Sequence, residues 1–118
     1  MIKKLALLIL LTMPPIAAQA HDEYQGVWET PSGVYMSIHQ YQNEIVLVLL
    51  NVEEWEAMTG YVVGPQVVVN TVYGGGHVQL TLHPLPNGRI KIMQVICTVL
   101  VSGYVCPSLD EVVIKKIF

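Results

Sequence analysis

The sequence predicts an all-β fold, a small antiparallel meander of about eight strands that closes, or nearly closes, into a barrel. Three observations support this prediction. From about residue 21 onward the chain is rich in valine, isoleucine, threonine and tyrosine, which favour strands. Glycine and proline recur about every 8–12 residues, the spacing of short strands joined by turns. The expected connections are nearly all tight hairpins, and closure of such a meander removes its two exposed edges.

The start of the chain has the features of a secretory signal peptide over residues 1–20. Lys3 and Lys4 form a positively charged N-terminal region, and Leu5–Leu11 form a short apolar region. Pro14-Pro15 ends that stretch well before the ~20 apolar residues that a membrane span needs. We therefore expect cleavage after Ala20, export to the bacterial periplasm or the medium, and one domain over residues 21–118.

The first strands of the mature chain are expected over 26–29 and 33–40, followed by a turn at 41–44. The run from Ile45 to Val52 is almost continuously apolar. Such runs are typical of strands that are covered on both faces, and this prediction is made for the third strand.

The segment after this run is ambiguous. Val52, Trp55 and Met58 recur at helical spacing, whereas alternate residues from Trp55 to Val63 recur at strand spacing. We favour a turn at 51–54 followed by a strand, because no helix N-cap with a long periodic run is present.

The second half predicts strands over 66–73, 77–83, 89–101 and 111–118. Asn87-Gly88 is a strong hairpin signal between the middle two. Alternation within the strands assigns a set of side chains to the core. These residues are Val34, Met36, Ile38, Val78, Leu80, Leu82, Ile90 and Ile92.

Cys97 and Cys106 are the two cysteines of the chain. In an exported protein an even number of cysteines predicts a disulfide. If residues 100–103 form a hairpin loop, Val99 pairs with Tyr104 and the two cysteines face each other across a returning strand. A bridge across so short a loop adds roughly 2.5–3 kcal/mol of stability on the chain-entropy model.

The mature chain is acidic. Without Lys3 and Lys4 it has four basic residues against nine acidic ones, a net charge of −5. No basic cluster is present, which argues against nucleic acid and anionic membrane surfaces as partners. The acidity is compatible with a cationic partner, and equally with a role in solubility alone.

No metal site is expected from the histidines. His77 and His83 share a strand face but lie six residues apart, about 20 Å along an extended strand. Nothing in the sequence fixes His39 against either of them. His21 could chelate copper through its amine and imidazole, but no second histidine follows at a recognisable spacing. We expect exposed histidines, no metal and no other cofactor.

No catalytic signature is present either. Ser37 and His39 share a strand face, and Asp110 lies elsewhere, but no nucleophile motif surrounds the serine. The glutamates of segment 53–56 fall in a charged turn, where solvated carboxylates are expected instead of an acid–base pair. We predict that the protein is not an enzyme.

The aromatic residues are the remaining lead to function. Trp28 and Trp55 are expected in the core or as plugs of the barrel ends. The 53% hydrophobic content favours either an apolar cavity in the barrel mouth or a self-association surface on an outer face. The residues assigned to a candidate ligand or partner face are Tyr35, Ser37, His39, Trp55 and Tyr61.

Gly26, Trp28 and Gly33, followed by an alternating strand, resemble the opening of calycin-type barrels such as avidins and lipocalins. The resemblance implies a meander barrel with Trp28 packed at the closed end and a cavity for a small ligand. The later tryptophans of the avidin site have no clear counterparts here, so Trp28 alone is carried over, as a structural position.

The chain is also similar to the small periplasmic lysozyme inhibitors in size, compartment and disulfide, with "SGYVC" at 102–106 as the local likeness. We therefore predict an exported, non-catalytic protein that binds either a small apolar ligand or a protein partner. The alternative is a self-associating structural or assembly subunit of the bacterial envelope, which would be a homo-oligomer.

Overall fold

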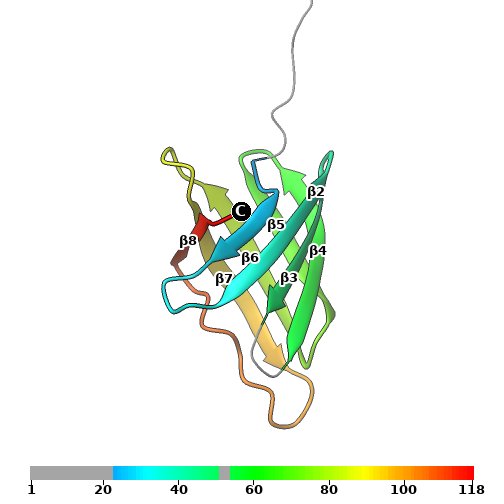
Figure 1. The fold of residues 1–118 in the computed structure, drawn as a ribbon. Coiled ribbons are helices and arrows are strands. Elements are labelled where there is room, and N and C mark those ends of the chain that lie inside the picture. The colour runs from blue at the N-terminus through cyan, green and yellow to red at the C-terminus, as the bar shows by residue number, and fades with distance from the viewer. Residues whose placement is uncertain (1–22, 51–53) are drawn as a thin grey trace, which may run out of the picture.

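The computed structural model describes residues 23–50 and 54–118 (Figure 1). The predicted signal peptide, the candidate copper ligand His21 and most of the predicted turn at 51–54 lie outside the described residues. Eight antiparallel strands follow one another around a closed barrel in the order of the sequence. They are β1 (Gly26–Glu29), β2 (Tyr35–Tyr41), β3 (Glu44–Leu50), β4 (Trp55–Val63), β5 (Gln66–Tyr73), β6 (Gly76–Pro84), β7 (Ile90–Val99) and β8 (Val112–Lys116).

The barrel closes where β1 pairs with β8. Trp28 lies opposite Lys116 in this antiparallel ladder, and Lys116 Nζ lies 5.5 Å from the centroid of the Trp28 ring. The N–H of Ile117 donates to the carbonyl of Val27 at 2.8 Å and extends the seam. The predicted all-β meander barrel is therefore confirmed. No helix among the described residues is long and apolar enough to cross a membrane.

Alternate residues of each strand point inward and form one core cluster. The predicted core positions on β2, β6 and β7 are confirmed as buried, except that Val34, just before β2, is half-buried. Side chains of this cluster are at most 3% exposed, so the barrel interior is occupied by the protein's own residues. The members are Tyr24, Trp28, Met36, Ile38, Ile45, Leu47, Leu49, Met58, Val67, Val69, Val78, Leu80, Leu82, Ile90, Ile92, Leu109 and Ile114.

The prediction that the third strand is covered on both faces is wrong. Ile45, Leu47 and Leu49 of β3 are buried in the barrel, but Val46 and Leu50 are 40% and 44% exposed on the outside. The reason is architectural, because a closed barrel seals only the inner face of each strand. Apolar residues on the outer side of β3 therefore remain at the surface.

The residues just before β1 are tied to the barrel by polar contacts. Tyr24 is buried, its N–H donates to Gln40 Oε1 at 3.2 Å, and its carbonyl accepts from Trp28 Nε1 at 3.0 Å. The indole N–H of Trp28 is thus satisfied inside the core, as buried tryptophans require. The prediction that Trp28 lies in the core is confirmed, whereas the closed-end position implied by the calycin resemblance stays a prediction.

A long connection, residues 100–111, runs from β7 back to β8 (Figure 1). The predicted return strand at 104–106 is wrong, because this segment pairs with no strand. The N–H groups of Leu100 and Val101 donate instead to the carbonyl of Gly75, at 3.0 and 2.8 Å. The chain is thereby tied to the β5–β6 loop, and Tyr104 N–H donates to Val101 O at 3.0 Å to complete a turn.

The predicted disulfide between Cys97 and Cys106 is confirmed, with a Cα–Cα separation of 6.1 Å. It joins β7 to the connection at 100–111 and does not cross a strand pair. The bridge therefore anchors a segment that has no strand partner of its own.

Candidate functional site

The structure brings the five residues of the predicted partner face onto one side of the barrel. The outward residues of β2 lie beside those of β3, which lie beside those of β4. Tyr35 is opposite Leu50, and Leu50 is opposite Trp55. Further along, Tyr41 is opposite Glu44, and Glu44 is opposite Tyr61. Ser37 and His39 fill the two rows between them on β2.

This side of the barrel carries a group of exposed apolar side chains, which we call the outer patch. Its members are between 40% and 64% exposed. Glu44 is the one acidic or basic residue among the outward positions of β2, β3 and β4, all of which the structure describes. The outer patch comprises Tyr35, Tyr41, Val46, Leu50, Trp55, Tyr61 and Val63.

A shallow groove of about 560 Å³ runs across the patch where β3, β4 and β5 meet. Its lining includes Val46, Tyr61 and the backbone of Gly60. A side chain at position 60 would collide with the carbonyl oxygen of Val68 on β5. Glycine at this position lets β4 and β5 approach closely, and the residue helps to form the groove.

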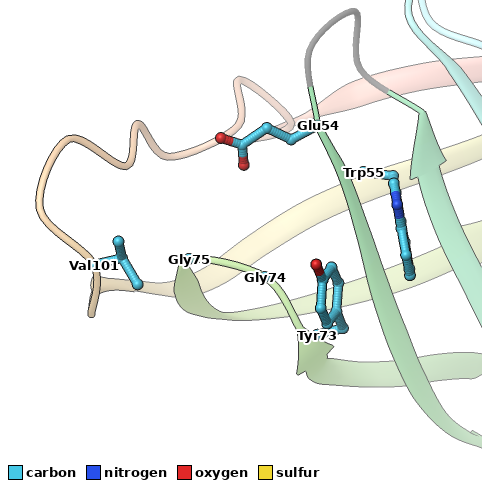
Figure 2. Close-up of a pocket in the computed structure, with 6 residues that line it drawn as sticks. All are labelled: Glu54, Trp55, Tyr73, Gly74, Gly75 and Val101. Atoms are coloured by element: carbon cyan, nitrogen blue, oxygen red, sulfur yellow. The ribbon is translucent and has the colours of Figure 1, made fainter.

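A second hollow lies at the barrel end beside the start of β4 and the turn between β5 and β6; we call it the end hollow. It encloses about 420 Å³ and is half-open to solvent. The rings of Trp55 and Tyr73 stack in it, with centroids 4.4 Å apart and planes 22° apart. Figure 2 shows these rings on one side, the Glu54 carboxylate above and Val101 opposite. The six lining residues are Glu54, Trp55, Tyr73, Gly74, Gly75 and Val101.

Behind the end hollow, a partly buried polar pair lies at the barrel end. Tyr104 donates a hydrogen bond from its hydroxyl to Glu56 Oε1 at 2.7 Å, and Glu56 is 3% exposed. Burial raises the pKa of the Tyr104 phenol well above its ordinary value, and the Glu56 hydrogen bond and the charges of Glu56 and Glu54 raise it further. The carboxylates of Glu56 and Glu54 therefore both raise the pKa of this phenol.

Glycines let the Tyr104 ring fit under the β5–β6 loop. A Cβ at Gly75 would lie 2.8 Å from the ring, and one at Gly76 would lie 2.5 Å from it. A Cβ at Gly74 would lie 3.1 Å from Glu56 Oε1. The glycines at 74–76 therefore pack closely against Tyr104 and Glu56.

Two predictions about this region are wrong. Trp55 is neither core nor plug, since it is 50% exposed and packs on Tyr73. Glu56 is not solvated in a turn, because β4 has already begun and position 56 points inward. Strand alternation indicates this inward position, since Glu56 and Met58 alternate with Trp55 and so share the inner face. Nothing in the sequence indicated the contact between Glu56 and Tyr104, 48 positions apart.

The histidines do not converge. His39 is exposed on β2 and His77 is exposed on β6, with three strands between them in the barrel. His83 Nε2 lies 3.2 Å from Thr81 Oγ1 on its own strand. Within the described residues, no three histidine, cysteine, aspartate or glutamate side chains lie close enough to hold a metal ion.

The residues considered for nucleophilic catalysis are likewise separate. Ser37 and His39 project from the outside of β2. Asp110 lies beside β7, where its Oδ1 accepts the N–H of Gln94 at 3.4 Å, and β7 does not pair with β2. These three residues do not form a Ser–His–Asp triad.

No family model, curated protein or solved structure matches this chain. The resemblances to calycin-type barrels and to lysozyme inhibitors therefore gain no support from comparison. The case for function depends on the outer patch and the end hollow.

Proposed function

We propose that the chain is an exported, non-catalytic binding protein whose partner is another protein, contacted through the outer patch. The observation that carries the proposal is the composition of this surface. Four of its seven members are tyrosine or tryptophan, and Glu44 is the one charged residue that faces outward on the same strands, with histidine counted as neutral. Enrichment in aromatic residues and depletion of charge distinguish the centres of protein interfaces from ordinary surface.

The size of the outer patch is consistent with this role. Half-exposed aromatic and aliphatic side chains in this number present on the order of 600 Å² of apolar surface. That area is at the upper end of what monomeric proteins expose. With its polar neighbours Ser37, His39 and Thr59, the patch approaches the ~800 Å² per partner of a standard interface. The groove beside Tyr61 gives it the relief that a protruding side chain of a partner could fill.

A small apolar ligand inside the barrel is the less favoured form of the binding hypothesis. Such a ligand needs an apolar cavity, and the inward side chains here pack into one continuous core cluster. A ligand would have to bind outside this core.

Purification of the mature protein from its host tests the proposal. We expect a complex of higher mass than the protein alone, which Val46→Lys breaks because it places a charge in the centre of the patch. His77→Lys is the matched control, since it adds the same charge at an exposed position on β6. A complex that survives Val46→Lys would contradict the outer patch as the contact. A lone protein that releases an extractable apolar compound would favour the ligand hypothesis instead.

Self-association through the same patch is the second candidate. It is favoured by the near absence of charge on the outward residues of β2, β3 and β4. Two copies can approach face to face there without bringing many like charges together, although each mature chain carries a net −5 elsewhere. In this case the complex contains the chain alone, and its mass depends on protein concentration.

A further inference from the structure

We propose that the end hollow binds a single positively charged side chain of a partner, arginine in preference to lysine, between the Tyr73 ring and the Glu54 carboxylate. This site is separate from the contact proposed for the outer patch, although Trp55 borders both. The argument uses the aromatic wall, the carboxylate and the backbone floor of the hollow in turn.

The aromatic wall suits a planar cation. Trp55 and Tyr73 are 50% and 56% exposed, so the stack is only partly buried and its outer surface is available to a ligand. A guanidinium group lies favourably on such a ring face through cation–π attraction and planar stacking. Trp55 supports Tyr73 from behind, and this fixed orientation reduces the entropy lost on binding.

The hollow is negatively charged. Among the described residues that line it, Glu54 is the one charged residue and none is basic. Glu56 lies just beneath, since a Cβ at Gly74 would touch its side chain. The four basic residues of the mature chain lie on β7, β8 and the turn before β7, and none of them is among the described residues that line the hollow. A cation entering the hollow would meet an uncompensated negative potential.

The floor and the far wall are held in position by the backbone. Gly74 and Gly75 place no side chain in the hollow, and their packing against Glu56 and Tyr104 requires glycine. Val101 is held opposite the rings because its N–H donates to Gly75 O. The volume of about 420 Å³ accommodates one long side chain, and the apolar walls suit its methylene groups.

The test uses the mature protein and two small probes that differ in charge. N-acetyl-arginine amide is titrated against N-acetyl-citrulline amide, which has nearly the same shape and no charge. The two indole N–H resonances report the result, because Trp55 borders the hollow and Trp28 is buried as an internal reference. We expect a saturable shift of the Trp55 signal alone, with a dissociation constant in the roughly millimolar range for an isolated side chain.

Variants locate the site. Glu54→Gln and Tyr73→Leu should each weaken arginine binding about three- to tenfold, as expected for a partly exposed ion pair or cation–π contact. Glu44→Gln is the matched control, because it removes one carboxylate beside the outer patch, away from the end hollow, and should leave the affinity unchanged. The two indole signals also verify that each variant is folded.

Three results would overturn the proposal. One is an equal response to the citrulline probe, which would remove the role of charge. Another is unchanged affinity in Glu54→Gln, which would remove the site. The third is a lysine probe that binds as tightly as arginine, which would contradict the preference for a planar cation. Failure of the outer-patch experiment would not affect these results, since no partner protein is used.

Discussion

At the scale of single residues, Glu56 and Tyr104 form a partly buried hydrogen bond at the barrel end. The carboxylate is 3% exposed and receives the phenol hydrogen bond at 2.7 Å. Leaving a buried acceptor without its donor costs more than the hydrogen bond contributes, because the group has lost its water as well. The pair should therefore respond asymmetrically to substitution.

We expect Tyr104→Phe to lower the free energy of unfolding by about 1–3 kcal/mol, because it keeps the ring and removes the donor. Urea denaturation of the mature protein measures the change. The double variant Tyr104→Phe with Glu56→Leu should recover part of the loss, since it also removes the carboxylate. A double variant that loses the sum of both single effects would show that the two residues are not coupled.

Tyr24 predicts a pH dependence of stability. Burial, with a smaller contribution from the charge of Glu23, raises the pKa of its phenol from 10.0 to about 12. Between these values the folded protein keeps a proton that the unfolded chain has released. The unfolded state then binds fewer protons, so the free energy of unfolding falls as pH rises. The full contribution is present below pH 10 and is lost through pH 12, up to about 2.5 kcal/mol.

Urea midpoints at pH 8, 10 and 11 measure this slope. Tyr24→Phe should make the decline shallower, although the raised pKa of Tyr104 preserves part of it. Tyr41→Phe is the control, because Tyr41 is 64% exposed. A slope that is the same in wild type and Tyr24→Phe would show that the Tyr24 phenol does not titrate differently in the two states.

At the scale of elements, the disulfide and the connection at 100–111 are the features that differ most from an ideal meander. The segment 104–106 has no strand partner, so the bridge and the Gly75 carbonyl hold it in place. Tyr104 and one wall of the end hollow both depend on that anchoring.

Replacing both cysteines with alanine should lower stability by roughly 2–3 kcal/mol, mainly because the unfolded chain loses a constraint over a short loop. Thermal unfolding, with and without a reducing agent, measures the effect. The reductant should lower the melting temperature of the wild type and leave that of the double variant unchanged. Equal melting temperatures for the two oxidised proteins would mean that the bridge does not form in solution.

Most strands could be predicted because inward and outward residues alternate along each strand of a barrel. The sequence spacing placed β1 and β5 at their observed bounds, and the core face of β6 followed from Val78, Leu80 and Leu82. The covered third strand was a wrong prediction, because apolar residues on both faces of β3 do not reveal whether anything packs on the outside. The return strand failed because backbone hydrogen bonds to a distant loop leave no local signal.

The candidate site was predictable in part for the same reason. Tyr35, Ser37 and His39 share a face by alternation alone, and β-strand pairing then adds Trp55 and Tyr61. The end hollow was not predictable, since it depends on the stacking of Trp55 with Tyr73 and on the position of Val101. These contacts join three connections that lie far apart in the sequence.

At the scale of the whole molecule, the apolar outer patch and the basic residues are separated. The outer patch covers β2, β3 and β4, whereas the four basic residues of the described part of the chain lie on β7, β8 and the turn before β7. Copies of an acidic protein repel one another at long range, and this repulsion weakens with salt because the Debye length falls to about 10 Å at 0.1 M. Apolar contact between patches is not weakened in this way.

We therefore expect that, if the patch mediates self-association, the purified mature protein forms larger species with rising concentration and with added salt. Sedimentation velocity over a concentration series measures the effect. Val46→Lys should reduce association at least about tenfold, since a charge buried in an apolar contact costs well over 1.4 kcal/mol, whereas His77→Lys should not. A monomer at every concentration would contradict self-association and leave a different protein as the occupant of the patch. Association that persists in Val46→Lys would place the contact on another face of the barrel.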